Sequence, residues 1–299
     1  MSSDNSAGTP GITQAMIDAY DEYTHLTLDR RGFMQKLTRL AGSGAAAAAI
    51  APMLAANQAR AAMVAADDGR IRGGDVPWPA GETEMRGYLV MPSDGQGALP
   101  AVVVIHENRG LNEHIRDVAR RLALEGFAAF APDFLSADGG TPEDEDRARE
   151  MIRALDGEQT VARAVAAVDW LSGHAETAGP VGAVGFCWGG GLVNQLAVAA
   201  PDDFKAAVAY YGRQPDASGV PSIEAPLLLH YAGLDDRINA GIDAYRAALE
   251  AAGKDFTIHV YEGVNHAFNN DTSAARYDET AAKLAWERTV TFFRDKLDG

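Results

Sequence analysis

The stretch Gly185-Phe186-Cys187-Trp188-Gly189-Gly190 decides the fold of this 299-residue chain. An apolar run over 181–186 precedes it and a helical pattern over 188–200 follows it, so the stretch marks a strand-to-helix turn. Side chains at positions 185 and 189 would collide with the neighbouring strand and helix. The spacing is that of a nucleophile elbow, G-x-S-x-G, with Cys187 in the serine position. The helix N-terminus behind the thiol favours a thiolate, so we predict a catalytic cysteine rather than a buried apolar one.

Short β-type runs alternate with helical runs from Glu84 onward. We expect strands at 85–90, 101–105, 127–131, 181–186, 206–211, 226–231 and 257–261. We expect helices at about 112–126, 142–155, 158–172, 188–200, 239–252 and 277–297. This order predicts the α/β class, with a mostly parallel sheet flanked by helices on both faces. Together with the elbow it indicates an α/β-hydrolase fold, in which ligands bind beyond the carboxyl ends of the strands.

The thiol needs a base and an orienting acid later in the chain, in the order nucleophile, acid, histidine. Asp235 follows the strand expected at 226–231, and His266 follows the strand expected at 257–261. Alone, Asp235 or its neighbour Asp236 is usually a solvated loop acid, and His266 could cap a turn. Their joint placement predicts that His266 takes the thiol proton and that Asp235 holds its tautomer.

The other histidines give no such signal. His230 lies inside an apolar strand and is expected to be a satisfied core histidine. No partner pattern surrounds His25, His114, His174 and His259. No His/Cys/Asp cluster has the spacing of metal ligands, so we expect neither a metal nor a cofactor.

The loop after the strand at 101–105 carries two further predictions. A backbone N–H of this loop, assigned to Asn108, and the N–H of Trp188 are expected to form an oxyanion hole. Glu107 follows the same buried strand. It is either paired, with Arg109 as the candidate, or placed to act on the thiol.

The charge of the chain limits its partners. The formal net charge is −16, and an acidic body repels phosphate backbones, so nucleic acid is not expected as a partner. Anion recognition, if any, has to be local. With one cysteine no intramolecular disulfide can form. We expect a monomer that acts on a small molecule.

The N-terminal 62 residues resemble a twin-arginine export signal. Arg30-Arg31 precedes a weakly apolar, Ala-rich stretch over 40–59, and Ala59-Arg60-Ala61 is a small-x-small cleavage site. We therefore expect an extension and leader at 1–62, a linker at 63–79 and the catalytic domain at 80–299. The implied partner is the twin-arginine export machinery and the implied location is the periplasm, without a stable membrane span. The alternative is a cytoplasmic protein whose N-terminal amphipathic helix docks on the body.

The chain also resembles a known family, the dienelactone hydrolases. The matching pieces lie in the family's order between residues 80 and 297. They are His106-Glu107 with Gly110-Leu111, Pro132-Asp133, the elbow 185–190, Tyr210-Tyr211-Gly212, Gly233-Leu234-Asp235 and the segment 263–268. Serine α/β-hydrolases lack both the cysteine and the Glu107 loop.

This resemblance implies hydrolysis of an enol lactone, carboxymethylenebutenolide, to maleylacetate. It also implies that Glu107 contacts the resting thiol, and that Arg147 and Tyr211 contact substrate. Asn269-Asn270 stand where a second substrate arginine is expected. A broader carboxylesterase and a non-catalytic exported binding protein are the competing functions.

Overall fold

One mixed sheet of eight strands organises the protein. The computed structural model describes residues 11–25, 28–55, 62–95, 97–200 and 202–297. The strand order is β1-β2-β4-β3-β5-β6-β7-β8. Their bounds are β1 Ile71–Ala80, β2 Thr83–Pro92, β3 Leu99–Ile105, β4 Ala128–Asp133, β5 Thr177–Phe186, β6 Phe204–Tyr210, β7 Leu227–Ala232 and β8 Phe256–Tyr261. The first two strands pair antiparallel with their neighbours, and all other pairs are parallel.

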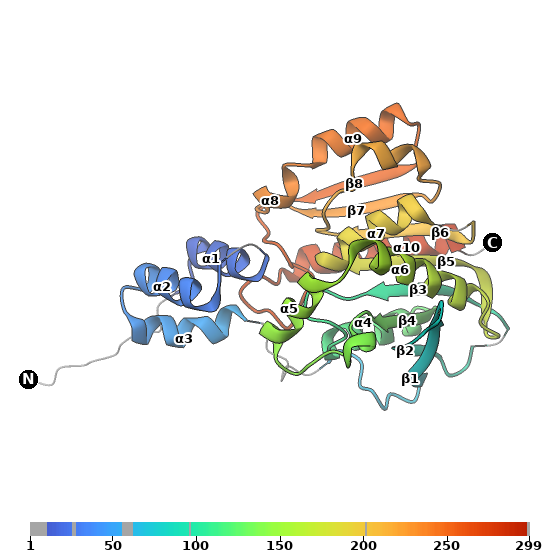
Figure 1. The fold of residues 1–299 in the computed structure, drawn as a ribbon, viewed down its shortest axis with the longest axis horizontal. Coiled ribbons are helices and arrows are strands. Elements are labelled where there is room, and N and C mark those ends of the chain that lie inside the picture. Colours follow the sequence, from blue (N-terminus) through green and yellow to red (C-terminus); the bar gives the residue numbers. More distant parts are fainter. Residues whose placement is uncertain (1–10, 26–27, 56–61, 96, 201, 298–299) are drawn as a thin grey trace, which may run out of the picture.

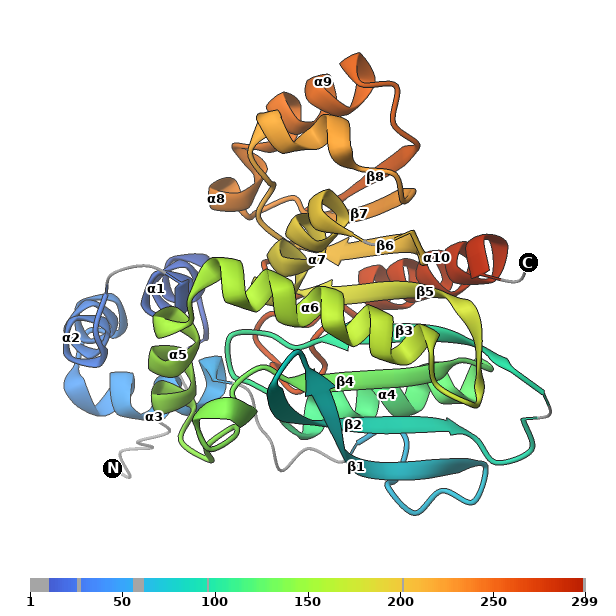
Figure 2. The same cartoon turned by 45° about the vertical axis from the view of Figure 1, so that its right-hand side comes forward.

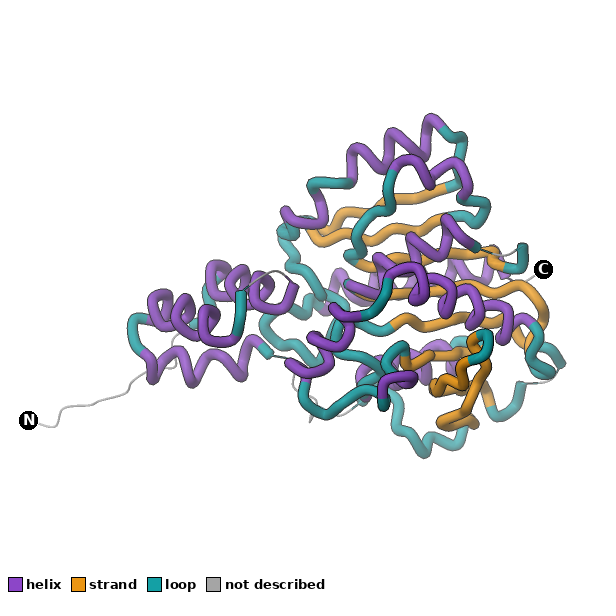
Figure 3. Tube along the Cα trace, in the orientation of Figure 1, coloured by secondary structure: helices purple, strands orange, loops and turns teal. Residues whose placement is uncertain are grey.

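Helices cover both faces of this sheet (Figures 1 and 3). Their bounds are α4 Glu113–Leu124, α5 Glu145–Ala154, α6 Gly157–Ser172, α7 Trp188–Ala199, α8 Asp236–Asn239, α9 Ile242–Ala251 and α10 Glu279–Leu297. Apolar residues of α6, α7 and α9 pack into one core, and those of α4 and α10 pack into another on the opposite face. The predicted α/β-hydrolase architecture is confirmed. Both faces of the central strands are buried, which explains why 101–105 is apolar without alternation.

The linker expected at 63–79 differs from the structure. Residues 71–80 form β1, which pairs along its whole length with β2. This strand does not look like one in the sequence, because it contains glycine and proline at Gly73, Gly74, Pro77 and Pro79. An edge strand tolerates proline because one side of its backbone has no ladder to complete. The folded domain therefore begins at about Ile71.

A lobe of three helices precedes the sheet domain. It consists of α1 Gln14–His25, α2 Arg30–Ala41 and α3 Gly44–Leu54. The lobe has its own apolar core, built from residues such as Tyr20, Phe33, Leu37 and Ile50. Figures 1 and 2 show this lobe beside α5, at the end of the domain toward which the parallel strands point.

The residues of the expected leader take regular structure within this lobe. Arg30 and Arg31 begin α2, whose first turn is capped by Asp29. No single described helix is long and apolar enough to cross a membrane, and α2 and α3 pass that test only as a pair bent by 113°. The expected cleavage site at 59–61 lies outside the described residues.

Candidate active site

Cys187 occupies a strained turn between β5 and α7. Its backbone has φ 55° and ψ −111°, a conformation that a residue with a side chain rarely adopts. The flanking glycines permit this turn. A Cβ on Gly185 would lie 2.2 Å from the backbone oxygen of Gly189, and a Cβ on Gly189 would lie 2.4 Å from that of Ile105. The strain and the two close approaches are the geometry expected of a nucleophile elbow.

Asp235 and His266 meet beyond the ends of β7 and β8. The Nδ1 of His266 lies 2.5 Å from Oδ2 of Asp235, and both side chains are buried. The other carboxylate oxygen of Asp235 accepts from the backbone N–H of Ile238. A carboxylate cannot donate, so Nδ1 carries the proton and Nε2 is the nitrogen left for chemistry. The exposed neighbour Asp236 takes no part.

The charges around His266 favour its protonated form. Burial opposes ionisation, but the nearby Cys187 and the Asp235 carboxylate outweigh it and raise the pKa of His266 to about 10. Burial likewise opposes ionisation of Asp235, yet the pKa of that carboxyl is lowered because it faces His266. The buried Nε2 of His266 has no hydrogen-bond partner among the described residues. Because the pKa of this imidazole is raised, it can act as a base that keeps the proton it takes from the thiol.

The hydrogen-bond partner of the thiol comes from outside the sheet domain. The Sγ of Cys187 lies 3.0 Å from Nε2 of His25, the last residue of α1. The ring of His25 packs edge-on against that of His266, with centroids 4.5 Å apart. This contact joins residues that are 162 positions apart in the sequence, and no motif near His25 indicates it. The sequence around His25 therefore does not predict this contact.

Glu107 is buried under the site but bonds elsewhere. Its Oε2 accepts a hydrogen bond of 2.8 Å from the side chain of Asn270 and lies 3.9 Å from a guanidinium nitrogen of Arg109. Arg109 also lies 2.9 Å from a carboxylate oxygen of Glu145 and donates to the hydroxyl of Tyr20. Asn270, at the position where a second substrate arginine was expected, therefore holds the carboxylate. The implied contact between Glu107 and the resting thiol is taken by His25 in this structure.

The two expected donors of the oxyanion hole are the backbone N–H groups of Asn108 and Trp188. Asn108 and Trp188 both line the cavity that Cys187 opens into. Neither backbone N–H donates to another described residue. The side chain of Asn108 is occupied, because its Nδ2 donates to the backbone oxygen of Thr24 at 2.9 Å. Two unpaired N–H groups near the nucleophile are what an oxyanion hole requires.

A cavity of about 620 Å³ joins these groups. Thr24 and His25 of the N-terminal lobe form part of its wall, so the lobe completes the cavity instead of filling it. Its arginines are Arg149, Arg153, Arg213 and Arg237, and none of the described residues that line it is acidic. Positive charge is therefore concentrated here on a protein whose net charge is −16.

The structure places the two expected substrate contacts differently. Tyr211 lines the cavity, and its buried hydroxyl has no partner among the described residues. Arg147 does not line the cavity; it lies 3.5 Å from Glu150 on the exposed side of α5. The α5 arginines that do reach the cavity, Arg149 and Arg153, are four residues apart and share a helix face.

Of the remaining histidines, His230 is a satisfied core residue, as predicted. It is fully buried, with its two ring nitrogens within 3.2 Å of Thr289 and 2.9 Å of Tyr261. Burial holds its pKa well below 6.5, so it stays neutral.

This geometry can be set beside known proteins. The model of the dienelactone hydrolase family matches residues 85–297. The chain belongs to the dienelactone hydrolase family. Membership supports a hydrolase of lactones or esters. The matched region begins after the N-terminal lobe, so His25 lies outside it.

Relatives and solved structures match about three quarters of the chain. A Salmonella typhi protein named "Putative carboxymethylenebutenolidase" is 34% identical over 246 residues, which cover 77% of this chain and 90% of that protein. "Protein usf" of Aquifex pyrophilus is 34% identical over 223 residues, covering 72% and 94%. The structure of a dienelactone hydrolase from Anabaena variabilis superposes with a TM-score of 0.61 at 26% identity, covering 76% of this chain and 99% of the other.

Proposed function

We propose that this protein opens lactones or esters through a thioester formed on Cys187. The observation that carries the proposal is the joint placement of a strained elbow cysteine and a buried Asp235–His266 pair at one cavity. A nucleophile, a base and an orienting acid in this arrangement serve acyl transfer.

In the first half of the reaction the thiol is acylated. His266 Nε2 takes the proton of Cys187, and the thiolate sulfur attacks the carbonyl carbon. The negative oxygen that forms is stabilised by the backbone N–H groups of Asn108 and Trp188. The carbon–oxygen bond of the ester then breaks, and the departing oxygen receives the proton from His266. In a lactone this oxygen stays attached to the opened product.

In the second half water releases the acyl group. His266 removes a proton from water, and the oxygen attacks the thioester carbon. The carbon–sulfur bond breaks, the sulfur regains its proton, and a carboxylic acid leaves. Asp235 keeps the imidazole oriented in both halves and stabilises its charged form.

The substrate that we propose is a small enol lactone that carries a carboxylate, of the carboxymethylenebutenolide type, opened to maleylacetate. The name of the Salmonella typhi relative supports it. The four cavity arginines and the absence of acidic lining residues among those described support an anionic substrate. Arg213 and Arg237 are both exposed. Arg213 lies in the loop after β6, and Arg237 lies in α8, next to Asp235.

A second candidate is a broader carboxylesterase. It is favoured by the apolar part of the cavity wall, which includes Ile152, Leu155, Val161 and Leu192. A cavity of about 620 Å³ also exceeds the needs of a small lactone. The two candidates differ in the acyl group and share the chemistry.

A substrate panel on the wild type and on Cys187→Ala tests the proposal. The panel contains the enol lactone, its methyl ester and neutral aryl esters of two to eight carbons. We expect the charged lactone to be opened fastest, and Arg213→Gln to raise KM for it more than for the neutral esters. Faster turnover of the longer neutral esters, unaffected by Arg213→Gln, selects the carboxylesterase. An inactive wild type rejects both.

The location is a separate proposal, which Arg30-Arg31, the Ala-rich stretch and the small-x-small site support: the protein is exported by the twin-arginine machinery and cleaved before Ala62. N-terminal sequencing of the native protein tests it. A full-length cytoplasmic chain, unchanged by replacing both arginines with lysine, contradicts it.

A further inference from the structure

We propose that His25 is a further catalytic residue, the resting hydrogen-bond partner of the Cys187 thiol, and that α1 is therefore part of the active site. The inference rests on the proposed function, since it concerns the same nucleophile. It applies to the chain that still carries residues 1–61; cleavage before Ala62 removes α1 with His25 and should speed alkylation as His25→Ala does. The key observation is the distance of 3.0 Å between Nε2 of His25 and Sγ of Cys187. A sulfur at this distance from a ring nitrogen forms a hydrogen bond.

The neighbours of His25 decide which atom holds the proton. Its Nδ1 lies 3.1 Å from the backbone oxygen of Asp21, which can only accept. Nδ1 also lies 2.8 Å from the hydroxyl oxygen of Thr24, whose own proton goes to the backbone oxygen of Tyr20. Both contacts place the ring proton on Nδ1. The Nε2 of His25 is then bare, and it accepts the S–H of Cys187.

The charges around His25 keep it in this state. Lost hydration, the neighbouring His266 and the guanidinium groups of Arg237 and Arg276 hold the pKa of His25 well below 6.5. His25 can therefore accept a hydrogen bond at neutral pH and is a poor acceptor of the whole proton. His266 is the group that takes the proton, because, against the effect of burial, the charge of the Cys187 thiolate that then forms and the Asp235 carboxylate raise the pKa of His266.

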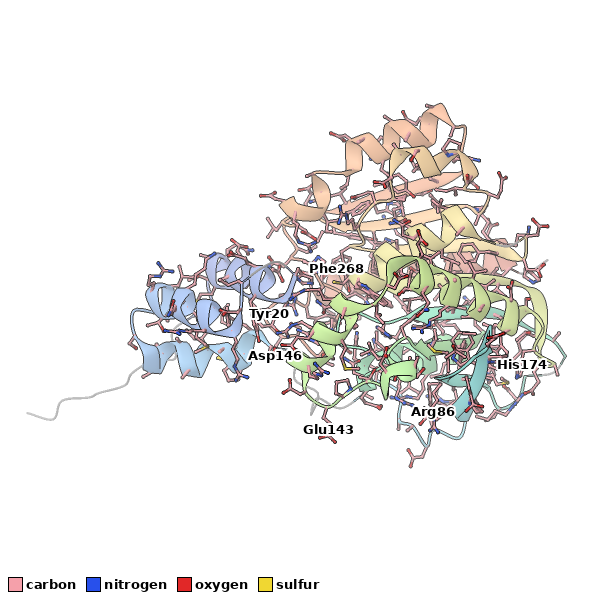
Figure 4. The ribbon with its side chains drawn as sticks, viewed as in Figure 1. Tyr20, Arg86, Glu143, Asp146, His174 and Phe268 are labelled. Carbon is pink, nitrogen blue, oxygen red and sulfur yellow. The ribbon has the colours of Figure 1, made fainter. Side chains whose placement is uncertain are left out.

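Helix α1 is fixed to the parts of the domain that carry the site. Asp21 lies 3.1 Å from Arg276, and Tyr20 accepts a hydrogen bond of 2.7 Å from Arg109. Tyr23 donates to Asp146 of α5, and the guanidinium of Arg149 lies over its ring. Figure 4 shows Tyr20 and Asp146 at this junction between the lobe and α5. Contacts from three separate segments hold His25 at the sulfur.

This arrangement defines the resting state of the reaction. The sulfur keeps its proton while it points to Nε2 of His25. For attack, the S–H turns to the unpartnered Nε2 of His266. A ring nitrogen of His266, a ring nitrogen of His25 and the Sγ of Cys187 all lie within 4.8 Å of one another. His266 then takes the proton and the sulfur becomes a thiolate. The hydrogen bond to His25 keeps the sole thiol of the chain protonated until this step.

Alkylation of the resting enzyme by iodoacetamide tests the proposal without any substrate. Cys187 is the only cysteine, so every alkylated thiol reports on it. Chelator is present throughout, because the three clustered atoms could hold a trace metal ion. In His25→Ala the thiol turns to His266, and we expect alkylation at pH 6.5 about tenfold faster, the factor that matches loss of one hydrogen bond. The pH profile of alkylation should move to lower pH.

Two replacements separate hydrogen bonding from shielding. His25→Gln offers an amide oxygen as acceptor, and we expect it to restore slow alkylation. His25→Phe fills the space without an acceptor, and we expect its pH profile to match that of His25→Ala. His174→Ala is the matched control, because His174 lies on the opposite side of the domain (Figure 4). Asp21→Asn, which loosens α1 from Arg276, should shift the profile in the same direction and serves if His25→Ala does not fold.

Two results overturn the proposal. One is a His25→Ala protein that alkylates at the wild-type rate with an unchanged pH profile. The other is a His25→Phe protein that behaves as the wild type while His25→Gln behaves as the alanine variant, which makes His25 a steric shield. Failure of the proposed function is a different result: the alkylation rates change as expected, but the wild type hydrolyses no lactone or ester.

Discussion

Replacing Asp235 by asparagine tests the assignment of the acid most sharply, because the chain supplies its own control. Asp235 is 7% exposed and bonds to His266 at 2.5 Å, whereas the adjacent Asp236 is exposed. Asp235→Asn and Asp236→Asn therefore remove the same charge one position apart. Only the first is expected to reach the reacting atoms.

The expected size follows from the shift on His266. Its pKa is raised from 6.5 to about 10, which corresponds to about 5 kcal/mol shared mainly between Cys187 and Asp235. Losing half of this costs about 2.5 kcal/mol, which lowers the equilibrium constant for proton transfer from Cys187 to His266 roughly a hundredfold. An asparagine can also donate to Nδ1 and place the ring proton on Nε2, which cannot then accept from the thiol, and a tautomer error of this kind costs up to about 10⁴ in kcat.

The assay is the pH dependence of kcat/KM on an aryl ester. We expect Asp235→Asn to lose between about 10² and 10⁴ in kcat/KM. Because His266 must be neutral to take the thiol proton and the carboxylate raises the pKa of His266, removing the carboxylate should also move the acid limb of the profile to lower pH. Asp236→Asn should stay within a factor of about two of the wild type. A variant Asp235→Asn that keeps more than a tenth of the activity, or an Asp236→Asn that loses more than it, refutes the assignment.

Three further outcomes are expected. Gly189→Ala should lower the free energy of unfolding, measured in urea melts, by at least about 2 kcal/mol, because its Cβ would lie 2.4 Å from a backbone atom. Gly191→Ala should change it by less than about 1 kcal/mol, because its Cβ would lie 3.5 Å from its nearest neighbour. Equal effects of the two variants contradict the elbow geometry. Asp271→Asn should cost up to about 2 kcal/mol at pH 7, because His114 and Arg121, against the opposing effect of burial, lower the pKa of Asp271 to about 2. Because the pKa of Asp271 in the folded state lies below the unfolded value of 3.8, its contribution to stability is present above pH 3.8 and is lost as the pH falls through 2. Urea melts of the variant and the wild type should therefore converge near pH 2. A difference that stays constant with pH contradicts this prediction. Glu107→Gln should speed alkylation of Cys187 by removing a nearby negative charge and should slow ester turnover; normal values for both make Glu107 purely structural.

The order of strands and helices could be predicted because apolar residues recur with a different spacing in a strand and in a helix. The apolar run 101–105, the cap at Asn112 and the elbow at 185–190 depend on neighbours close in sequence, and all are found. Asp235 and His266 could be located because the fold brings the ends of consecutive parallel strands to one edge. Strand β1 was missed because an edge strand tolerates the proline and glycine that otherwise signal a linker.

The rest of the site depends on contacts that no local pattern records. His25 reaches the sulfur across 162 positions, from a lobe that has its own apolar core. Polar contacts such as those of Tyr20 with Arg109 and of Asp21 with Arg276 fix this lobe to the sheet domain. The direction of the α5 arginines is equally hidden. Arg147 and Arg149 are two residues apart and so lie on nearly opposite sides of the helix, and the sequence does not say which side faces the cavity.

The central claim is a covalent thioester on Cys187, and its most direct measurement is the mass of the enzyme trapped during turnover. The protein is mixed with excess aryl ester, quenched in acid within milliseconds, digested and analysed by mass spectrometry. We expect the acyl mass on the peptide that contains Cys187, appearing with the first burst of product and disappearing when substrate is exhausted. In Cys187→Ala the adduct should be absent and kcat should fall at least about 10³-fold with an unchanged thermal melt. Hydrolysis by Cys187→Ala at more than a tenth of the wild-type rate, or an acyl group found on another residue, contradicts the claim.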